Sequence, residues 1–251
     1  MNYTNEKIIE RLESGENLKY LLFWGHQKSD RITKSCFSQG YESEFEVNGI
    51  KYLTAEHYMM AEKALLFGDK EIYQQIIESE KAGKVKELGR QVRYFNQRVW
   101  EKNRFEIVVR GNFHKFGQDP ELSHFIKNTG DGILVEASPV DNIWGIGIAQ
   151  NEENAETPYF WNGLNLLGYA LMETRDILNE IGDFKILENP VLPPWLAYPE
   201  IDRYDIGWRM GYGEDHIIKL GGYWDRLSKT EKRIYQLSYP EHGEWKDWYD
   251  N

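Results

Sequence analysis

The alternation of apolar and polar positions predicts a few short strands among longer amphipathic segments. We expect strands at residues 21–26 and 133–135, and a hairpin formed by residues 45–47 and 50–53. Asn48-Gly49 separates the two hairpin strands, and this dipeptide favours the tight turn that joins antiparallel strands.

Apolar positions with helical spacing predict helices in six further segments. We expect these helices at residues 1–20, 55–67, 71–79, 98–117, 120–128 and 164–178. Thr54 precedes the second of them and can cap its first turn, because threonine side chains accept backbone N–H groups at helix starts. The last helix is apolar on most sides, so we expect it to be buried.

The proline-rich segment at residues 189–194 marks a change in amino-acid composition, and we interpret it as a boundary. The chain beyond it is rich in Trp, Tyr and Gly, and only residues 228–237 have a pattern typical of a helix. We therefore divide the chain into an N-terminal helical extension (1–20), a main domain (21–186) and a C-terminal appendage of unknown role (187–251).

Composition narrows the possible functions. The net charge of −11 disfavours broad electrostatic capture of nucleic acid, although it does not exclude a local basic pocket. Cys36 is the only cysteine, and the six histidines have no metal-ligand spacing, so we expect neither disulfides nor a metal site. No glycine-rich nucleotide motif suggests a cofactor, and we expect none. The N-terminus lacks an apolar signal core and no run is long enough to span a membrane, so we expect a cytoplasmic protein without membrane contact.

Candidate chemistry is concentrated in residues 136–147, which follow the strand at 133–135. This loop contains Glu136, Asp141, Trp144 and Gly145, and glycine allows a ligand to approach the backbone closely. Two interpretations fit these residues equally well: a functional loop, or a tight turn capped by Asp141 with Trp144 in the core. We expect Glu136 only to anchor the loop.

The helix at 55–67 carries Glu56 and Lys63 seven residues apart, which places both on one face. The common alternative is an exposed surface pair. Because the neighbouring positions are mostly apolar, burial of these charges would require partners and would shift their pKa values. Arg90, beside a glycine at a helix end, and Lys115 are candidate phosphate contacts, although solvated side chains are the more common outcome.

Carboxylates, a lysine and tryptophans together suggest glycoside chemistry. Carboxylates can stabilise an oxocarbenium-like centre or activate water, and a desolvated lysine can form a Schiff base with a sugar aldehyde. Asn165, which we expect in the first turn of the helix at 164–178, has an amide that can face a ligand. A non-catalytic binding module and a purely structural arrangement remain alternatives.

Several motifs occur in an order that resembles the NADAR (YbiA-like) family over residues 21–178. The motifs are Phe23-Trp24-Gly25, residues 35–39, 45–64 with Ala55-Glu56-His57-Tyr58, Gly89-Arg90, Trp100, Lys115-Phe116, 136–147 and 161–172. The resemblance implies a mostly helical α+β domain that cleaves N-glycosidic bonds of ribose. One departure is at residues 37–41, where many members have Ser-Asn-Phe and this chain has Phe-Ser-Gln-Gly-Tyr.

The resemblance implies catalytic roles for Glu56, Lys63 and Asp141. It implies substrate contacts at Trp100 and Trp144, and we add Trp24, Arg90, Lys115, Gly145 and Asn165 as expected contacts. Family activities are removal of ADP-ribose from guanine bases in DNA, in some members as antitoxin to an ADP-ribosyltransferase toxin, and hydrolysis of riboflavin-pathway ribosylamines. We expect the first, on a single-stranded or flipped base.

Overall fold

The computed structural model describes residues 1–25, 27 and 30–250. It separates into unit 1 (Met1–Glu180) and unit 2 (Ile181–Asn251). Both units are mostly helical, and the strands are short. The expected α+β class with a predominance of helix is confirmed.

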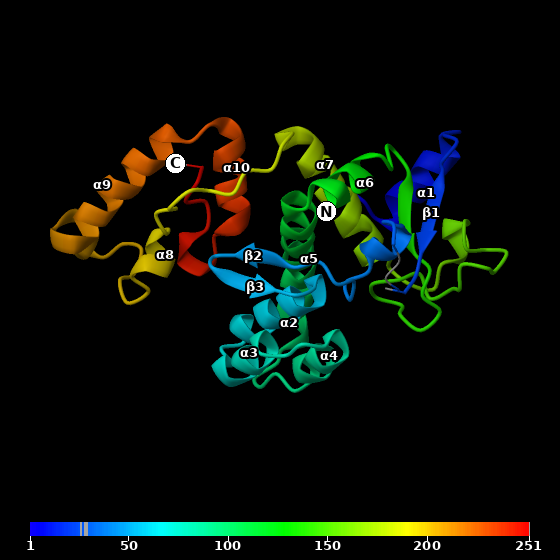
Figure 1. The fold of residues 1–251 in the computed structure, drawn as a ribbon, viewed down its shortest axis with the longest axis horizontal. Helices are drawn as coiled ribbons and strands as arrows, with labels where there is room; N and C mark the ends of the chain where they lie inside the picture. The colour runs from blue at the N-terminus through cyan, green and yellow to red at the C-terminus, as the bar shows by residue number, and fades with distance from the viewer. Residues whose placement is uncertain (26, 28–29, 251) are drawn as a thin grey trace. The chain divides into compact units, whose positions relative to one another are not determined.

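The strands of unit 1 form two small sheets (Figure 1). β1 (Tyr20–Phe23) lies parallel to β4 (Ile133–Glu136), with Tyr20 opposite Ile133 and Phe23 opposite Glu136. β2 (Phe45–Val47) and β3 (Ile50–Tyr52) form the expected antiparallel hairpin. Both residues of its Asn48-Gly49 turn have positive φ, as this kind of turn requires.

The helices of unit 1 follow the apolar periodicity closely, except at the N-terminus. They are α1 (Asn5–Glu13), α2 (Ala55–Leu66), α3 (Lys70–Ile77), α4 (Ala82–Arg90), α5 (Gln97–Gln118), α6 (Pro120–Lys127) and α7 (Leu166–Ile181), with the short 3-10 turns η1 (Lys34–Phe37) and η2 (Pro158–Phe160). The expected helix at 1–20 is too long, because Gly15 adopts φ +90° and the chain enters β1 at Tyr20. The expected strand at 21–26 ends at Phe23, and His26 lies outside the described residues.

Helix α5 forms the centre of unit 1, with α2 against its lower part in the view of Figure 1. Its buried side chains include Phe113 and Phe116, and the latter packs near Phe37 of η1 at 6.0 Å between ring centroids. Thr54 caps α2 as expected, since its side chain accepts the His57 N–H. This core holds the N-terminus of α2 in a fixed position beside the segment that follows η1.

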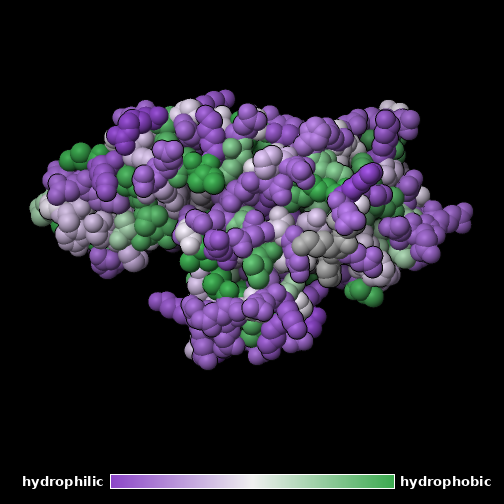
Figure 2. Space-filling model, viewed as in Figure 1, coloured by the Kyte–Doolittle hydropathy of each residue, from purple (hydrophilic) through white to green (hydrophobic). Residues whose placement is uncertain are grey.

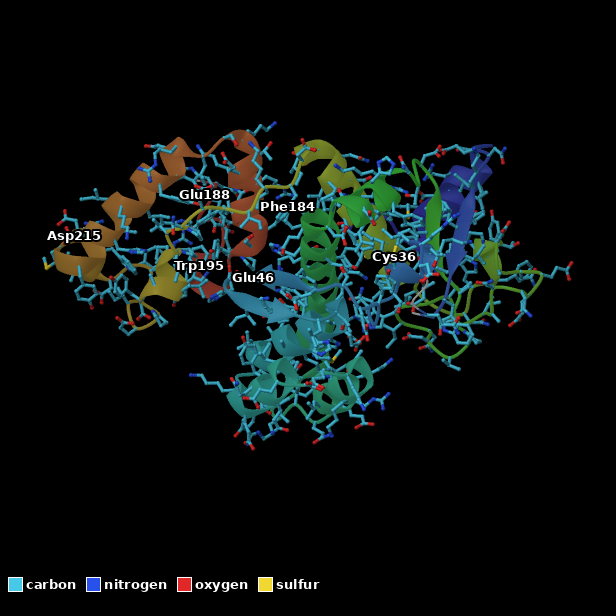
Figure 3. The ribbon with its side chains drawn as sticks, viewed as in Figure 1. Cys36, Glu46, Phe184, Glu188, Trp195 and Asp215 are labelled. Carbon is cyan, nitrogen blue, oxygen red and sulfur yellow. The ribbon has the colours of Figure 1, made fainter. Side chains whose placement is uncertain are left out.

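Unit 2 contains α8 (Pro194–Ala197), η3 (Ile206–Arg209), α9 (Gly211–Arg226), α10 (Lys229–Ser238) and η4 (Gly243–Trp245). The expectation of a single helix was wrong, because α9 is a regular helix of 16 residues. Four glycines lower its intrinsic helix propensity, and burial of Leu220 and Tyr223 compensates for them. Trp195 of α8, labelled in Figure 3, packs on Trp245 at 5.5 Å between ring centroids.

Hydrophilic residues cover most of the lobe formed by α3 and α4 at the bottom of Figure 2. Among the described residues, no helix is both long enough and apolar enough to cross a membrane.

Candidate functional site

The candidate site lies at the carboxyl edge of the parallel pair β1 and β4. Both strands end at this edge, where ligands of parallel sheets commonly bind. Trp24 follows β1 and is 56% exposed, whereas Glu136 is the last residue of β4. The Ala137 N–H donates to the Phe23 carbonyl at 2.9 Å, which joins the start of the 136–147 loop to the end of β1.

Backbone hydrogen bonds fasten this loop to the segment before α7. The N–H groups of Leu164, Asn165 and Leu167 donate to the carbonyls of Asn142, Gly145 and Trp144 at 3.0–3.1 Å. Such bonds satisfy the free donors at the start of a helix. The loop is therefore held at both ends by regular structure.

Glycine is required where the loop and this segment cross. A Cβ on Gly145 would lie 2.8 Å from the Glu136 carbonyl oxygen, and one on Gly163 would lie 2.2 Å from the Gly145 carbonyl oxygen. Gly145, which we expected to contact substrate, is buried and serves this close crossing.

Asp141 organises the turn inside the loop. Its Oδ1 accepts the N–H groups of Ile143 at 2.9 Å and Trp144 at 2.8 Å. Trp144 itself is only half-buried, so it is not a core side chain. Of the turn interpretation, the structure confirms the cap by Asp141 but not a core position for Trp144. The functional interpretation of the loop stays a prediction.

Glu56 lies in the first turn of α2 and is 8% exposed. Its N–H donates to the Gln39 carbonyl at 2.8 Å. Burial raises the pKa of Glu56 to about 7; Asp141 raises it further, while the cations Lys86 and Arg90 oppose the rise. Burial thus raises the pKa of Glu56, as the sequence led us to expect for a carboxyl on a mostly apolar helix.

Glu136 belongs to the same group of charges, although the sequence suggested only an anchoring role. Burial raises its pKa to about 8, and the Asp141 and Glu56 carboxylates add to the rise, while Lys86 opposes it. Its backbone still anchors the loop, because its carbonyl accepts the Ile146 N–H at 2.9 Å. The structure therefore brings Glu56, Glu136 and Asp141 together.

Three buried side-chain oxygens at the carboxylate site lack a hydrogen-bond donor among the described residues. Glu56 Oε1, Glu136 Oε2 and Gln39 Oε1 are buried, and none has a hydrogen-bond partner among the residues that the structure describes. A buried acceptor without a donor costs free energy, so a protonated carboxyl or a donor-rich ligand stabilises such a site. Gln39 falls within the segment in which this chain departs from the family pattern.

Lys86 and Arg90 supply the positive charge at this site. They lie four residues apart on one face of α4, and both are exposed. Arg90 was expected from the sequence and Lys86 was not, although their spacing of four residues in an amphipathic segment places them on one helical face. The neighbouring glycine has a packing role, since a Cβ on Gly89 would lie 2.0 Å from Met60 Sδ.

Lys63 and Trp100 form a second group beside the first. The Lys63 Nζ donates to the Gly89 carbonyl at 2.7 Å and lies 4.4 Å from the Phe95 ring centroid and 5.5 Å from that of Trp100. Burial lowers the pKa of Lys63. Lys63 lies seven residues after Glu56 in α2, which separates them by roughly 10 Å along the helix axis. The C-terminal end of α4 lies near both, because the Gly89 carbonyl accepts from Lys63 and the Arg90 charge acts on Glu56.

Two expected substrate contacts have structural partners instead. Lys115 is fully buried, and its Nζ donates to the carbonyls of Cys36 at 2.6 Å and Ser38 at 2.9 Å. Asn165 precedes α7 with φ +50°, outside the helical turn that we expected, and it is fully buried. Its amide donates to the Leu134 carbonyl and accepts the Glu136 N–H, so it positions β4.

The chemistry of this site follows from its carboxyl groups. No cluster of three or more His, Cys, Asp or Glu side chains within the described part of the chain has the geometry to hold an ion. Near neutral pH the raised pKa values let Glu56 and Glu136 retain protons, close to the Asp141 carboxylate and to the side chains of Lys86 and Arg90. Such a set can protonate a leaving group and stabilise positive charge at a sugar carbon.

Comparison with known proteins assigns the chain to a family. The NADAR domain matches residues 22–179. The chain is 43% identical over 166 residues to an N-glycosidase of Acanthamoeba polyphaga mimivirus, covering 64% of this chain and 97% of that protein. It is 28% identical over 148 residues to a riboflavin biosynthesis protein of Vibrio vulnificus, covering 59% of this chain and 36% of that protein.

A solved structure gives the same result. The NMR structure of the E. coli protein YbiA aligns with a TM-score of 0.52 and 25% identity, covering 65% of this chain and 88% of that chain. The protein thus belongs to the NADAR domain family, as its motifs suggested. The matched region contains Glu56, Lys63, Glu136 and Asp141.

Proposed function

We propose that this protein is an N-glycosidase that hydrolyses the bond between ribose C1 and an exocyclic amine nitrogen. The observation that carries the proposal is the convergence of Glu56, Glu136 and Asp141 at the carboxyl edge of β1 and β4, with two raised carboxyl pKa values. Relatives named as N-glycosidases support the same class of reaction.

In the proposed reaction, Glu56 acts as the general acid. As the C1–N bond breaks, its electron pair stays on nitrogen, which takes the Glu56 proton and leaves as the amine. The Asp141 carboxylate stabilises the positive charge at C1 and accepts a proton from the water whose oxygen bonds to C1. A carboxyl with a pKa of about 7 suits this acid role, because catalytic pKa values work best near the operating pH.

Lys63 offers a second route through an imine. Its nitrogen replaces the leaving amine at C1 of the ring-opened sugar, and water then hydrolyses the C=N bond to release the sugar aldehyde and restore the lysine. Burial favours the neutral, nucleophilic amine that this route needs. Borohydride would trap the imine as a covalent sugar adduct, absent from Lys63→Arg. Turnover without any adduct would support direct displacement by water.

ADP-ribosylated guanine in DNA is the substrate that we favour, which gives an activity that reverses the product of an ADP-ribosyltransferase toxin. Trp24 and Trp144 offer exposed and half-exposed ring faces for a base, and base–aromatic stacking contributes roughly 1–3 kcal/mol. Lys86 and Arg90 can take the pyrophosphate. A flipped or single-stranded base needs only this small footprint despite the acidic net charge.

A riboflavin-pathway ribosylamine is the second candidate, because the Vibrio vulnificus relative is named for riboflavin biosynthesis. Purified protein should be offered both an ADP-ribosylated guanine oligonucleotide and a phosphorylated ribosylamine, and the released sugar identified by mass. Release of ADP-ribose alone supports the favoured substrate, and release of ribose phosphate alone supports the second. Tight binding of ADP-ribose without release from either would show a binding module.

The phosphate contacts can be tested separately. Lys86→Ala with Arg90→Ala should raise KM at least tenfold for the phosphate-bearing substrate and leave kcat within about threefold. Lys84→Ala is the matched control, because Lys84 is exposed on the same helix and pairs with Glu87 at 3.7 Å. An equal effect of both changes would remove Lys86 and Arg90 from substrate binding.

A further inference from the structure

Unit 2 contains a cavity of about 390 Å³ that the N-glycosidase chemistry does not use. The described residues of its wall all belong to unit 2: two aliphatic side chains together with Arg203, Gly221, Trp224, Tyr235, Trp248 and Tyr249. Small-molecule pockets typically measure roughly 300–1,000 Å³, so the cavity suits a single ring system with a short substituent. A second hollow of about 630 Å³ is lined by charged side chains of both signs.

Aromatic rings with fixed orientations form much of the wall. Trp224 and Tyr249 are stacked, with ring centroids 5.5 Å apart and planes 16° apart. Tyr235 stands edge-on to both, at 77° to Trp224 and 90° to Tyr249. The Tyr235 hydroxyl donates to the Val191 carbonyl at 2.6 Å and the Tyr249 hydroxyl to the Tyr239 carbonyl at 2.8 Å, so both rings are held in place.

Among the lining residues that the structure describes, Arg203 alone has a charged side chain. Its Nη1 donates to the carbonyls of Glu244 at 2.7 Å and Lys246 at 2.6 Å, and the guanidinium lies 6.0 Å from the Trp248 ring. Within the described part of the chain, Nε and Nη2 have no partner. The fixed guanidinium therefore presents free donors, which match the geometry of a carboxylate or phosphate.

Gly221 keeps one side of the cavity open. It lies inside α9, where glycine costs about 1 kcal/mol relative to alanine. No neighbour explains that cost, because a Cβ at this position would meet nothing within 4 Å. Gly222 has equally free surroundings but does not line the cavity, so it provides a natural control.

We propose that unit 2 binds a planar aromatic anion in this cavity. The ring of the ligand packs on the partly buried Trp224 and Trp248 side chains, and its acidic group binds the free donors of Arg203. An aromatic cation would also suit such walls, but the guanidinium repels it. The proposal concerns unit 2 alone and is independent of the reaction proposed for unit 1.

Binding can be measured on the full chain with AMP and naphthalene-1-sulfonate as probes, by calorimetry and tryptophan fluorescence. Both are planar aromatic anions, and adenosine and benzamidine serve as the uncharged and cationic counterparts. We expect saturable binding of at least one anionic probe, at least tenfold tighter than its counterparts. Absence of saturable binding by both anions would overturn the proposal.

Variants locate the bound probe, because AMP can also occupy the substrate site of unit 1. Gly221→Leu fills the cavity and should weaken binding at least tenfold, whereas Gly222→Leu should keep it within about twofold. Arg203→Gln should remove the preference for AMP over adenosine. Equal affinities of the two leucine variants, each with an unchanged circular dichroism spectrum, would show that the probe binds elsewhere and would refute the assignment.

Discussion

Replacing Glu56 by glutamine should abolish most activity and yet stabilise the protein at alkaline pH. As the proposed general acid, Glu56 contributes a proton that the amide cannot supply, so kcat should fall on the order of a hundredfold or more. The stability effect has the opposite sign because the folded protein must ionise a buried carboxyl as pH rises. Gln has a similar shape and never ionises.

The size of the stability change follows from the pKa of Glu56, which burial raises from 4.5 to about 7. The folded state holds this proton more tightly than the unfolded state. The stabilising contribution of the Glu56 proton is therefore fully present below pH 4.5 and is lost as pH rises through about 7. Relative to a side chain that never ionises, the raised pKa of Glu56 destabilises the folded state by roughly 3 kcal/mol above pH 8 and by about 1 kcal/mol at pH 5.

The assay is denaturant unfolding of wild type and Glu56→Gln from pH 5 to pH 9, followed by circular dichroism. The stability advantage of the variant should grow by about 2 kcal/mol over this range. Glu87→Gln, an exposed change on α4, should show no such trend. A variant that is less stable than wild type at pH 9, or an advantage that does not grow with pH, would refute the assignment of a buried carboxyl with a raised pKa.

Three further predictions test the neighbouring features. The kcat of wild type should fall between pH 7 and pH 9, because the proposed general acid Glu56, with a pKa of about 7, loses its proton and the nearby Glu136, with a pKa of about 8, follows; initial rates that stay constant to pH 9 would contradict this. Lys115→Met should lower the free energy of unfolding by roughly 2–4 kcal/mol, because two backbone carbonyls lose their donor, without raising KM for a phosphate-bearing substrate. Gly168→Ala, whose Cβ would lie 2.1 Å from the Leu134 carbonyl oxygen, should lower thermal stability sharply, whereas Gly83→Ala, which meets nothing within 4 Å, should be neutral or stabilising by up to about 1 kcal/mol.

The helices of unit 1 were predictable because their signals are local. Thr54 caps α2 through its own side chain, and the periodicity of residues 98–117 matches α5 to within one residue at each end. The family motifs likewise singled out Glu56 and Asp141, since residue type and order along the chain are properties of the sequence. The sequence did not predict α9, because its glycines weaken the local helical signal and aromatic side chains distant in the sequence stabilise the helix.

The grouping of charges depended on tertiary structure. Parallel pairing of β1 with β4 places Glu136 opposite Phe23, and packing of α4 on α2 places Lys86 near Glu56, although nothing in the local sequence links these residues. Burial then decides protonation, because desolvation is a property of everything packed around a group. Contact between α5 and η1 likewise joins the Lys115 amine to the carbonyls of Cys36 and Ser38. Sequence alone determined which chemical groups this protein possesses, and the tertiary fold decided which of them share one site and which hold it together.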